Sequence, residues 1–168
     1  MHNNVTSKRN CRAGHFVTLE QNGTANHILA HYLQGQIYRT ETKDNMQKSN
    51  ISAKEVIGQI IEGVQEKKGK GIVVVDMLKL GNSVCDYFVI CQGNSPNQVS
   101  AITDSIADMV REKCGKKPYA IDGLRNCQWV AMDYGDILVH VFLPDVRAFY
   151  DIEHLWADAT ITEIPDLD

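Results

Sequence analysis

Apolar residues recur with a helical period in two segments of the chain. The first helix is expected to begin after Ser52, because Glu55 three residues later completes a capping box; its apolar positions are Val56, Ile57, Ile60, Ile61 and Val64. Gly69 and Gly71 are expected to end this helix, since glycine commonly follows a helix C-terminus. The pattern predicts an amphipathic helix with one face in the core.

The second periodic segment has the clearer start signal. Ser95 is a favourable N-cap residue, Pro96 occupies the first helical position, and Gln98 is the expected capping-box partner. The apolar stripe that follows consists of Val99, Ile102, Ile106, Met109 and Val110. Gly115 and Pro118 are expected to end this second helix.

Short runs rich in β-branched and aromatic residues predict strands between and after these helices. The expected strands are residues 72–77, 87–91, 119–122, 128–133 and 136–143, and a third helix should run from Pro144 to about Trp156. The order is helix, two strands, helix, three strands, helix. This order predicts an α/β fold in which a mixed β-sheet is flanked by helices.

Residues 128–143 predict a β-hairpin with two different faces. With Tyr134 and Gly135 at the tip, the expected pairs are Asp133 with Asp136, Ala131 with Leu138, and Trp129 with His140. The apolar face should enter the core and carries Gln128, Val130, Met132, Ile137, Val139, Val141 and Leu143. The mixed face should be covered by the third helix or by a partner, and it carries Trp129, Ala131, Asp133, Asp136, Leu138, His140 and Phe142. A slip of one residue would exchange the faces.

The third helix contains three aromatic residues, Phe149, Tyr150 and Trp156. Aromatic side chains at helical spacing usually belong to the core, but Trp and Tyr are also favoured anchors of protein interfaces. The pattern alone leaves both interpretations open.

Charge is divided unevenly along the chain. Residues 1–45 hold five of the 17 basic and three of the 21 acidic residues, so residues 46–168 hold 12 basic and 18 acidic residues, a net charge of −6. Nucleic-acid phosphates repel a domain with this negative net charge, so little direct nucleic-acid contact is expected and a basic protein is the better partner.

The first 45 residues show no sustained hydrophobic period. They are expected to be a poorly ordered or non-native extension, with Met46 as a candidate start, before a domain over residues 46–168.

Composition argues against several classes of protein. No stretch of about 18 apolar residues occurs, so no membrane span is expected. The sequence does not decide between a bacterial cytosol and an organelle, and a cytoplasmic location is the favoured expectation. The five cysteines form no C-x-x-C pair, which indicates separate thiols in a reducing compartment and no zinc site. No metal or cofactor is expected.

Three long stretches of the chain form distinctive segments, namely residues 86–95 (DYFVICQGNS), 129–142 (WVAMDYGDILVHVF) and 147–156 (RAFYDIEHLW). They resemble signature segments of the ribosomal silencing factor (RsfS, or Iojap) family, and the similarity extends over about residues 52–158. The resemblance implies a translation repressor that binds the large ribosomal subunit through ribosomal protein fourteen and sterically blocks joining of the small subunit. It also implies a homodimer-prone domain with nucleotidyltransferase-like topology.

The resemblance further implies which residues bind the ribosomal protein, namely Trp129, Asp133, Tyr134, Asp136, Phe149 and Tyr150. The motif of the final helix also includes Glu153, Leu155 and Trp156. The chain departs from the family pattern at Asp122, before Gly123, where Glu is more common.

A metal-dependent nucleotidyltransferase is the main enzyme alternative. This chemistry needs a phosphate-binding turn at a helix N-terminus and two carboxylates alternating on one strand to hold two metal ions. Residues 93–95 (GNS) partly meet the first need, but Leu138 follows Asp136 where the second carboxylate is required. The catalytic carboxylate pair is therefore missing.

Two further alternatives are weaker. A cysteine hydrolase built from Cys91 or Cys127 with His140 lacks a third group to orient the imidazole. An RNA-binding ribosome assembly factor would use basic clusters, here Lys67, Lys68 and Lys70, or Lys113, Lys116 and Lys117, and cations at helix ends explain both clusters more simply. The sequence thus favours a non-enzymatic function.

Overall fold

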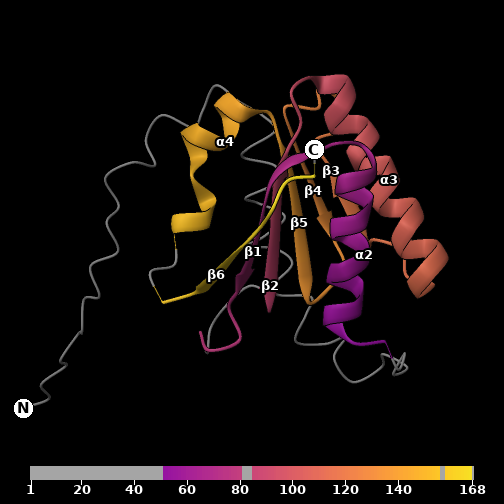
Figure 1. The fold of residues 1–168 in the computed structure, drawn as a ribbon, viewed down its shortest axis with the longest axis vertical. Helices are drawn as coiled ribbons and strands as arrows, with labels where there is room; N and C mark the ends of the chain where they lie inside the picture. Colours follow the sequence, from indigo (N-terminus) through magenta and orange to yellow (C-terminus); the bar gives the residue numbers. More distant parts are fainter. Residues whose placement is uncertain (1–50, 81–84, 156–157, 168) are drawn as a thin grey trace, which may run out of the picture.

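The computed structural model describes residues 51–80, 85–155 and 158–167 of the chain (Figure 1). The predicted extension over residues 1–45 and Trp156, the predicted end of the third helix, lie outside the described residues. The helices are α2 (Ala53–Glu66), α3 (Pro96–Cys114) and α4 (Pro144–Tyr150), with a 3₁₀ turn η2 (Ile152–His154). The strands are β1 (Lys70–Asp76), β2 (Tyr87–Gln92), β3 (Ala120–Asp122), β4 (Trp129–Asp133), β5 (Ile137–Phe142) and β6 (Thr160–Ile164).

The strands form one six-stranded mixed sheet in the order β3-β4-β5-β2-β1-β6. β2 and β5 are parallel, and the other neighbouring pairs are antiparallel. This arrangement confirms the predicted α/β class with a mixed sheet flanked by helices. The sequence did not predict β6, because four of its five residues are exposed and its apolar residues show no strand alternation.

The two faces of the sheet are covered unequally. α2 and α3 lie side by side across one face, whereas α4 and η2 lie on the other (Figure 1). The predicted core face of the hairpin is confirmed on the α2–α3 side, where the buried hairpin residues are Val130, Met132, Ile137, Val139 and Val141. Among the described residues, no helix combines the length and the hydropathy that a membrane span requires.

The two predicted helix starts are both present, but only one is a complete capping box. Ser52 accepts a hydrogen bond from the Glu55 N–H, and the Glu55 carboxylate accepts one from the Ser52 N–H. Ser95 likewise accepts from the Gln98 N–H, at 3.2 Å. The Gln98 side chain, however, bonds to the Asn94 N–H and to carbonyls at the end of α2, so the second box is only half formed.

The predicted hairpin register is wrong by two residues. Asp133 pairs with Leu138, and Trp129 pairs with Phe142. The reason is a longer turn, in which the Tyr134 N–H donates to the Ile137 carbonyl at 2.9 Å and the Asp133 carboxylate accepts from the Gly135 N–H at 2.7 Å. Because a two-residue shift keeps each side chain on its original face, the predicted faces survive the wrong register.

The third helix is shorter than predicted. α4 ends at Tyr150, and Asp151 adopts a left-handed backbone conformation with φ of 41°. The chain then forms η2, whose last residue is His154. The aromatic segment is therefore a helix and a separate turn, lying over the mixed face of the hairpin.

Candidate functional site

Aromatic rings gather on the face of the sheet that α4 covers. The Trp129 ring stacks on Phe142, its strand partner, with ring centroids 4.9 Å apart. Tyr150 of α4 lies over the same indole, with centroids 5.0 Å apart. Trp129, Phe142 and Tyr150 therefore form one cluster that joins β4, β5 and α4.

His140 supplies the polar member of this cluster. Its Nδ1 accepts a hydrogen bond of 3.1 Å from the Trp129 Nε1–H, and its ring meets Phe88 edge-on at 5.2 Å. Complete burial lowers the pKa of His140 to about 3, because desolvation disfavours the charged ring. His140 is therefore neutral at physiological pH.

The structure separates His140 from the two cysteines of the hydrolase alternative. Cys91 and Cys127 belong to the core on the α2–α3 side, whereas His140 lies in the α4-facing half of the sheet with Phe142 and Trp129. Burial also raises the pKa of Cys91 to about 12, so its thiol stays protonated. Neither thiol faces the imidazole as a nucleophile would face its base.

The structure buries two of the predicted binding residues, Trp129 and Tyr134. Trp129 is only 3% exposed, because Tyr150 covers it, and Tyr134 is only 6% exposed. Tyr134 also belongs to the opposite core, on the α2–α3 side, and burial raises its pKa well above the ordinary range. The two rings do not share a surface in this structure.

The remaining predicted interface residues divide between the two ends of β5. Phe149 and Tyr150 follow β5, and their rings stand 5.0 Å apart, with 74% of Phe149 exposed. Asp133, the last residue of β4, and Asp136, in the turn before β5, lie at the opposite end of this strand, where Asp136 is exposed and Asp133 is half-buried. The structure brings Trp129, Phe149 and Tyr150 together and leaves the acidic turn apart.

Arg147 fastens α4 to the sheet, a role that the sequence did not indicate. Its Nη1 donates to the Gly71 carbonyl at 2.6 Å and to the Gln92 side chain at 3.3 Å. Its Nε and Nη2 donate to one Glu153 carboxylate oxygen at 3.1 and 2.8 Å. Gly71 and Gln92 are 76 and 55 residues from Arg147 in sequence, so no local pattern could reveal these contacts.

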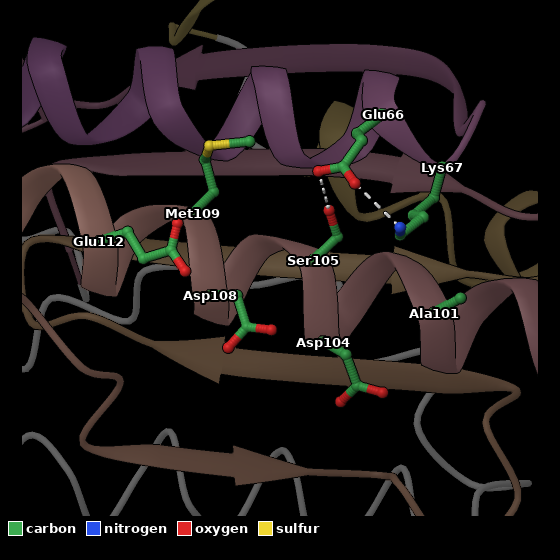
Figure 2. Close-up of a pocket in the computed structure, with 8 residues that line it drawn as sticks. All are labelled: Glu66, Lys67, Ala101, Asp104, Ser105, Asp108, Met109 and Glu112. Atoms are coloured by element: carbon green, nitrogen blue, oxygen red, sulfur yellow. Dashed lines mark hydrogen bonds and ion pairs between the residues drawn. The ribbon is translucent and has the colours of Figure 1, made fainter.

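A groove of about 440 Å³ lies between α2 and α3 on the other side of the molecule. Figure 2 shows Asp104, Asp108 and Glu112 along α3, and Glu66 on α2 with its carboxylate directed at Ser105 and Lys67. Glu66 accepts a hydrogen bond of 3.1 Å from Ser105 and pairs with Lys67 at 2.9 Å. Carboxylates on exposed helix faces are ordinary solvated groups, so this groove is no evidence of a ligand site.

The described residues give little support to metal chemistry. Asp151, Glu153 and His154 form the one described group whose ligand atoms lie within 4.8 Å of one another. Glu153 is already bound to the Arg147 guanidinium, a cation that opposes a second cation there. Leu138 is buried in the apolar cluster under α4, at the place where a nucleotidyltransferase would need its second carboxylate.

Comparisons with known proteins agree on one family. A family model described as "Ribosomal silencing factor during starvation" matches residues 50–168. A ribosomal silencing factor RsfS from Halalkalibacterium halodurans is 35% identical over 114 residues, which cover 68% of this chain and 96% of that protein. The mouse protein named "Mitochondrial assembly of ribosomal large subunit protein 1" is 29% identical over 109 residues, which cover 64% of this chain and 47% of that protein.

A solved structure agrees with the sequence relatives. The crystal structure of a Chromobacterium violaceum protein matches with a TM-score of 0.60 and 36% identity, covering 64% of this chain and 88% of that one. The predicted resemblance is thereby confirmed over the described fold. The chain belongs to the ribosomal silencing factor (RsfS) family of ribosome-associated translation regulators.

Proposed function

We propose that this chain binds the large ribosomal subunit through ribosomal protein fourteen and that its bulk keeps the small subunit from joining. The observation that carries the proposal is the outer surface of α4, where Phe149 is 74% exposed beside Tyr150. Exposed aromatic residues are typical anchors of protein interfaces. Family membership supports the ribosome as the partner.

The charge around α4 favours a basic partner. Asp145 in the first turn of α4 and Asp151 after its last turn are both exposed, on either side of Phe149. An apolar centre with an acidic rim is complementary to a basic protein surface, and opposite charges increase the rate of encounter. Residues 46–168, with a net charge of −6, add to this attraction.

The proposed docking surface is smaller than the sequence predicted. Phe149 and Tyr150 are its anchors, with exposed Leu155 beyond them. Asp133 and Asp136 lie at the far end of β5 and would contribute through charge if the partner extends that far. The repression needs no catalytic step, because a bound domain excludes the small subunit by occupying the space between the subunits.

A matched pair of substitutions tests the docking surface. Phe149→Glu places a charge in the apolar centre and is expected to weaken binding to purified large subunits about thirtyfold, which corresponds to about 2 kcal/mol. Leu78→Glu is the control, because Leu78 is 57% exposed at the end of β1 that lies away from α4. Co-sedimentation in sucrose gradients measures the binding of both variants to large subunits. Equal binding by Phe149→Glu and the parent chain would contradict the surface.

A second experiment separates repression from ribosome assembly, the function that the mouse relative's name describes. Adding the chain to mature large and small subunits should slow their joining, measured by light scattering. Phe149→Glu should lose this effect. An assembly factor without a repressive role would bind precursor particles and leave the joining of mature subunits unchanged.

We also propose that the free protein forms a homodimer in the cytoplasm, as the family resemblance suggests. Sedimentation equilibrium over a range of concentrations tests this state directly. A single monomeric species at every concentration would overturn the dimer without affecting the docking proposal.

A further inference from the structure

The two sides of the sheet differ in how firmly their helices are held. α2 buries five of its residues and α3 buries seven. α4 and η2, which we call the cover (residues 144–154), contain no buried residue. Yet the sheet face under the cover is lined by buried apolar residues that include Phe88, Trp129 and Phe142. This apolar surface is therefore closed by side chains that are themselves only partly buried, namely Val146, Tyr150 and Ile152.

A polar latch is a second attachment of the cover, in addition to the apolar contacts of Val146, Tyr150 and Ile152. The latch is the Arg147 side chain with its partners Glu153, the Gly71 carbonyl and the Gln92 side chain. The side chains of Arg147 and Glu153 are only 12% and 17% exposed, so their charges attract each other more strongly than a surface pair would. The latch joins both parts of the cover to β1 and β2.

Gly71 shows that the backbone of β1 is shaped around this latch. Its φ is +57°, a conformation that favours glycine, and it lies where the register of β1 against β2 shifts. A β-carbon at this position would stand 2.7 Å from Arg147 Nη1. A side chain at residue 71 would therefore push the guanidinium away from the carbonyl that it binds.

The polar group beneath the cover is satisfied without it. The Trp129 Nε1–H donates to His140, which belongs to the sheet and not to the cover. Lifting the cover would remove Tyr150 from the indole but would leave this hydrogen bond intact. Opening thus breaks the latch and exposes apolar rings, while the Trp129 Nε1–H keeps its hydrogen bond to His140.

We propose that the cover opens as a unit when the latch releases, and that the ribosomal protein binds the open form more tightly because it then reaches Trp129 as well as Phe149. This inference rests on the proposed function. A ligand that prefers an open minor state binds more tightly when that state becomes more populated. Weakening the latch should therefore strengthen docking.

Glu153→Gln is the principal test variant, because it removes the negative charge of the latch and keeps the shape of the side chain. Arg147→Met is a second, stronger perturbation in case one substitution affects folding. Glu163→Gln is the matched control, since Glu163 lines the same hollow beside Arg147 and has no ion pair with it among the described residues. All variants carry Trp156→Phe, so that Trp129 is the single tryptophan.

Two measurements are made on each full-length variant. Acrylamide quenching of Trp129 fluorescence reports opening, and co-sedimentation with large subunits reports affinity. Glu153→Gln should raise the quenching constant and tighten binding by about threefold to tenfold, with Glu163→Gln unchanged. Unchanged quenching in both latch variants overturns the inference that the cover opens when the latch is weakened. Increased quenching with unchanged or weaker binding shows that the closed form docks and overturns the inference, while the proposed function stands. Absence of subunit binding by the parent chain overturns the proposed function instead.

Discussion

The Trp129 indole donates a hydrogen bond of 3.1 Å to Nδ1 of His140 beneath α4. Because Nδ1 accepts this bond, the neutral imidazole carries its own proton on Nε2. The pair satisfies two buried polar groups on an otherwise apolar face. It also makes the stability of the fold depend on pH in a direction that can be stated.

Lowering the pH should destabilise the protein through His140. Its folded pKa is lowered to about 3 by burial, whereas the unfolded residue has an ordinary pKa near 6.5. Between these values the unfolded chain binds a proton that the folded chain does not, so the free energy of unfolding decreases as the pH falls. The contribution is up to about 1.4 kcal/mol per pH unit. Urea unfolding at several pH values between 7 and 4 measures the slope.

His140→Gln should make this slope shallower by about one proton, although it lowers stability at every pH. His154→Gln is the control with the opposite sign. The hydrogen bond with Asp151 raises the pKa of His154, so its stabilisation is present at low pH and is lost as the pH rises through the folded pKa. If His140→Gln leaves the pH dependence of the free energy of unfolding unchanged, His140 is not the group responsible for it.

Removing the Tyr134 hydroxyl should stabilise the fold. This hydroxyl is buried and has no hydrogen-bond partner among the described residues. An unpaired buried polar group costs about 1–3 kcal/mol, so Tyr134→Phe is expected to raise the free energy of unfolding by about 1 kcal/mol. Tyr150→Phe is the control, because the Tyr150 ring is half-buried and its hydroxyl is not among the buried unpaired groups. This substitution should change the free energy of unfolding less. Loss of stability in Tyr134→Phe would show that the hydroxyl has a partner in solution.

Two glycines of α2 should respond to alanine with opposite signs. Gly58 has no atom within 4 Å of the position that a β-carbon would take, so Gly58→Ala should stabilise the helix by about 0.5–1 kcal/mol. A β-carbon on Gly63 would lie 2.9 Å from the Ile106 Cα of α3. Gly63→Ala should therefore destabilise the protein by about 1–3 kcal/mol. Thermal unfolding of both variants tests this prediction, and shifts of the melting temperature with the same sign would contradict the packing described for Gly58 and Gly63.

Gln98 joins the end of α2 to the start of α3, and its loss should weaken both. Its Nε2 donates to the carbonyls of Lys67 and Lys68 at 3.0 and 3.1 Å, and its Oε1 accepts from the Asn94 N–H at 2.8 Å. Gln98→Leu should lower the free energy of unfolding by about 1–3 kcal/mol. Asn97→Ala, at the exposed neighbouring position, should stay within about 0.5 kcal/mol. Chemical denaturation compares the two variants, and equal effects on the free energy of unfolding would argue against a stabilising role of the Gln98 hydrogen bonds.

The sequence predicted the first two helices and the fold class well because their signals are local. The Ser52 capping box and the apolar stripes of α2 and α3 involve residues three or four positions apart. The same reasoning assigned Gln98 to a capping box, yet in the structure its amide reaches the carbonyls of Lys67 and Lys68. A contact 31 residues away in sequence cannot be read from a cap motif.

The candidate site was only partly predictable. The pattern showed that the face of Trp129 needs a cover, and the structure supplies one from α4. Whether an apolar face is covered by its own chain or by a partner depends on where a helix ends and turns. Here the turn is set by the left-handed backbone of Asp151 and by the latch at Arg147, and neither has a sequence signature.

β6 limits how far the cover can move. β5 precedes the cover and β6 follows it, and both strands are hydrogen-bonded into the same sheet. The cover is consequently a loop anchored at two ends and not a free C-terminal arm, so its release is a short excursion that re-forms readily. An edge strand that buries little of itself thus serves as a tether, which should make the proposed opening of the cover reversible.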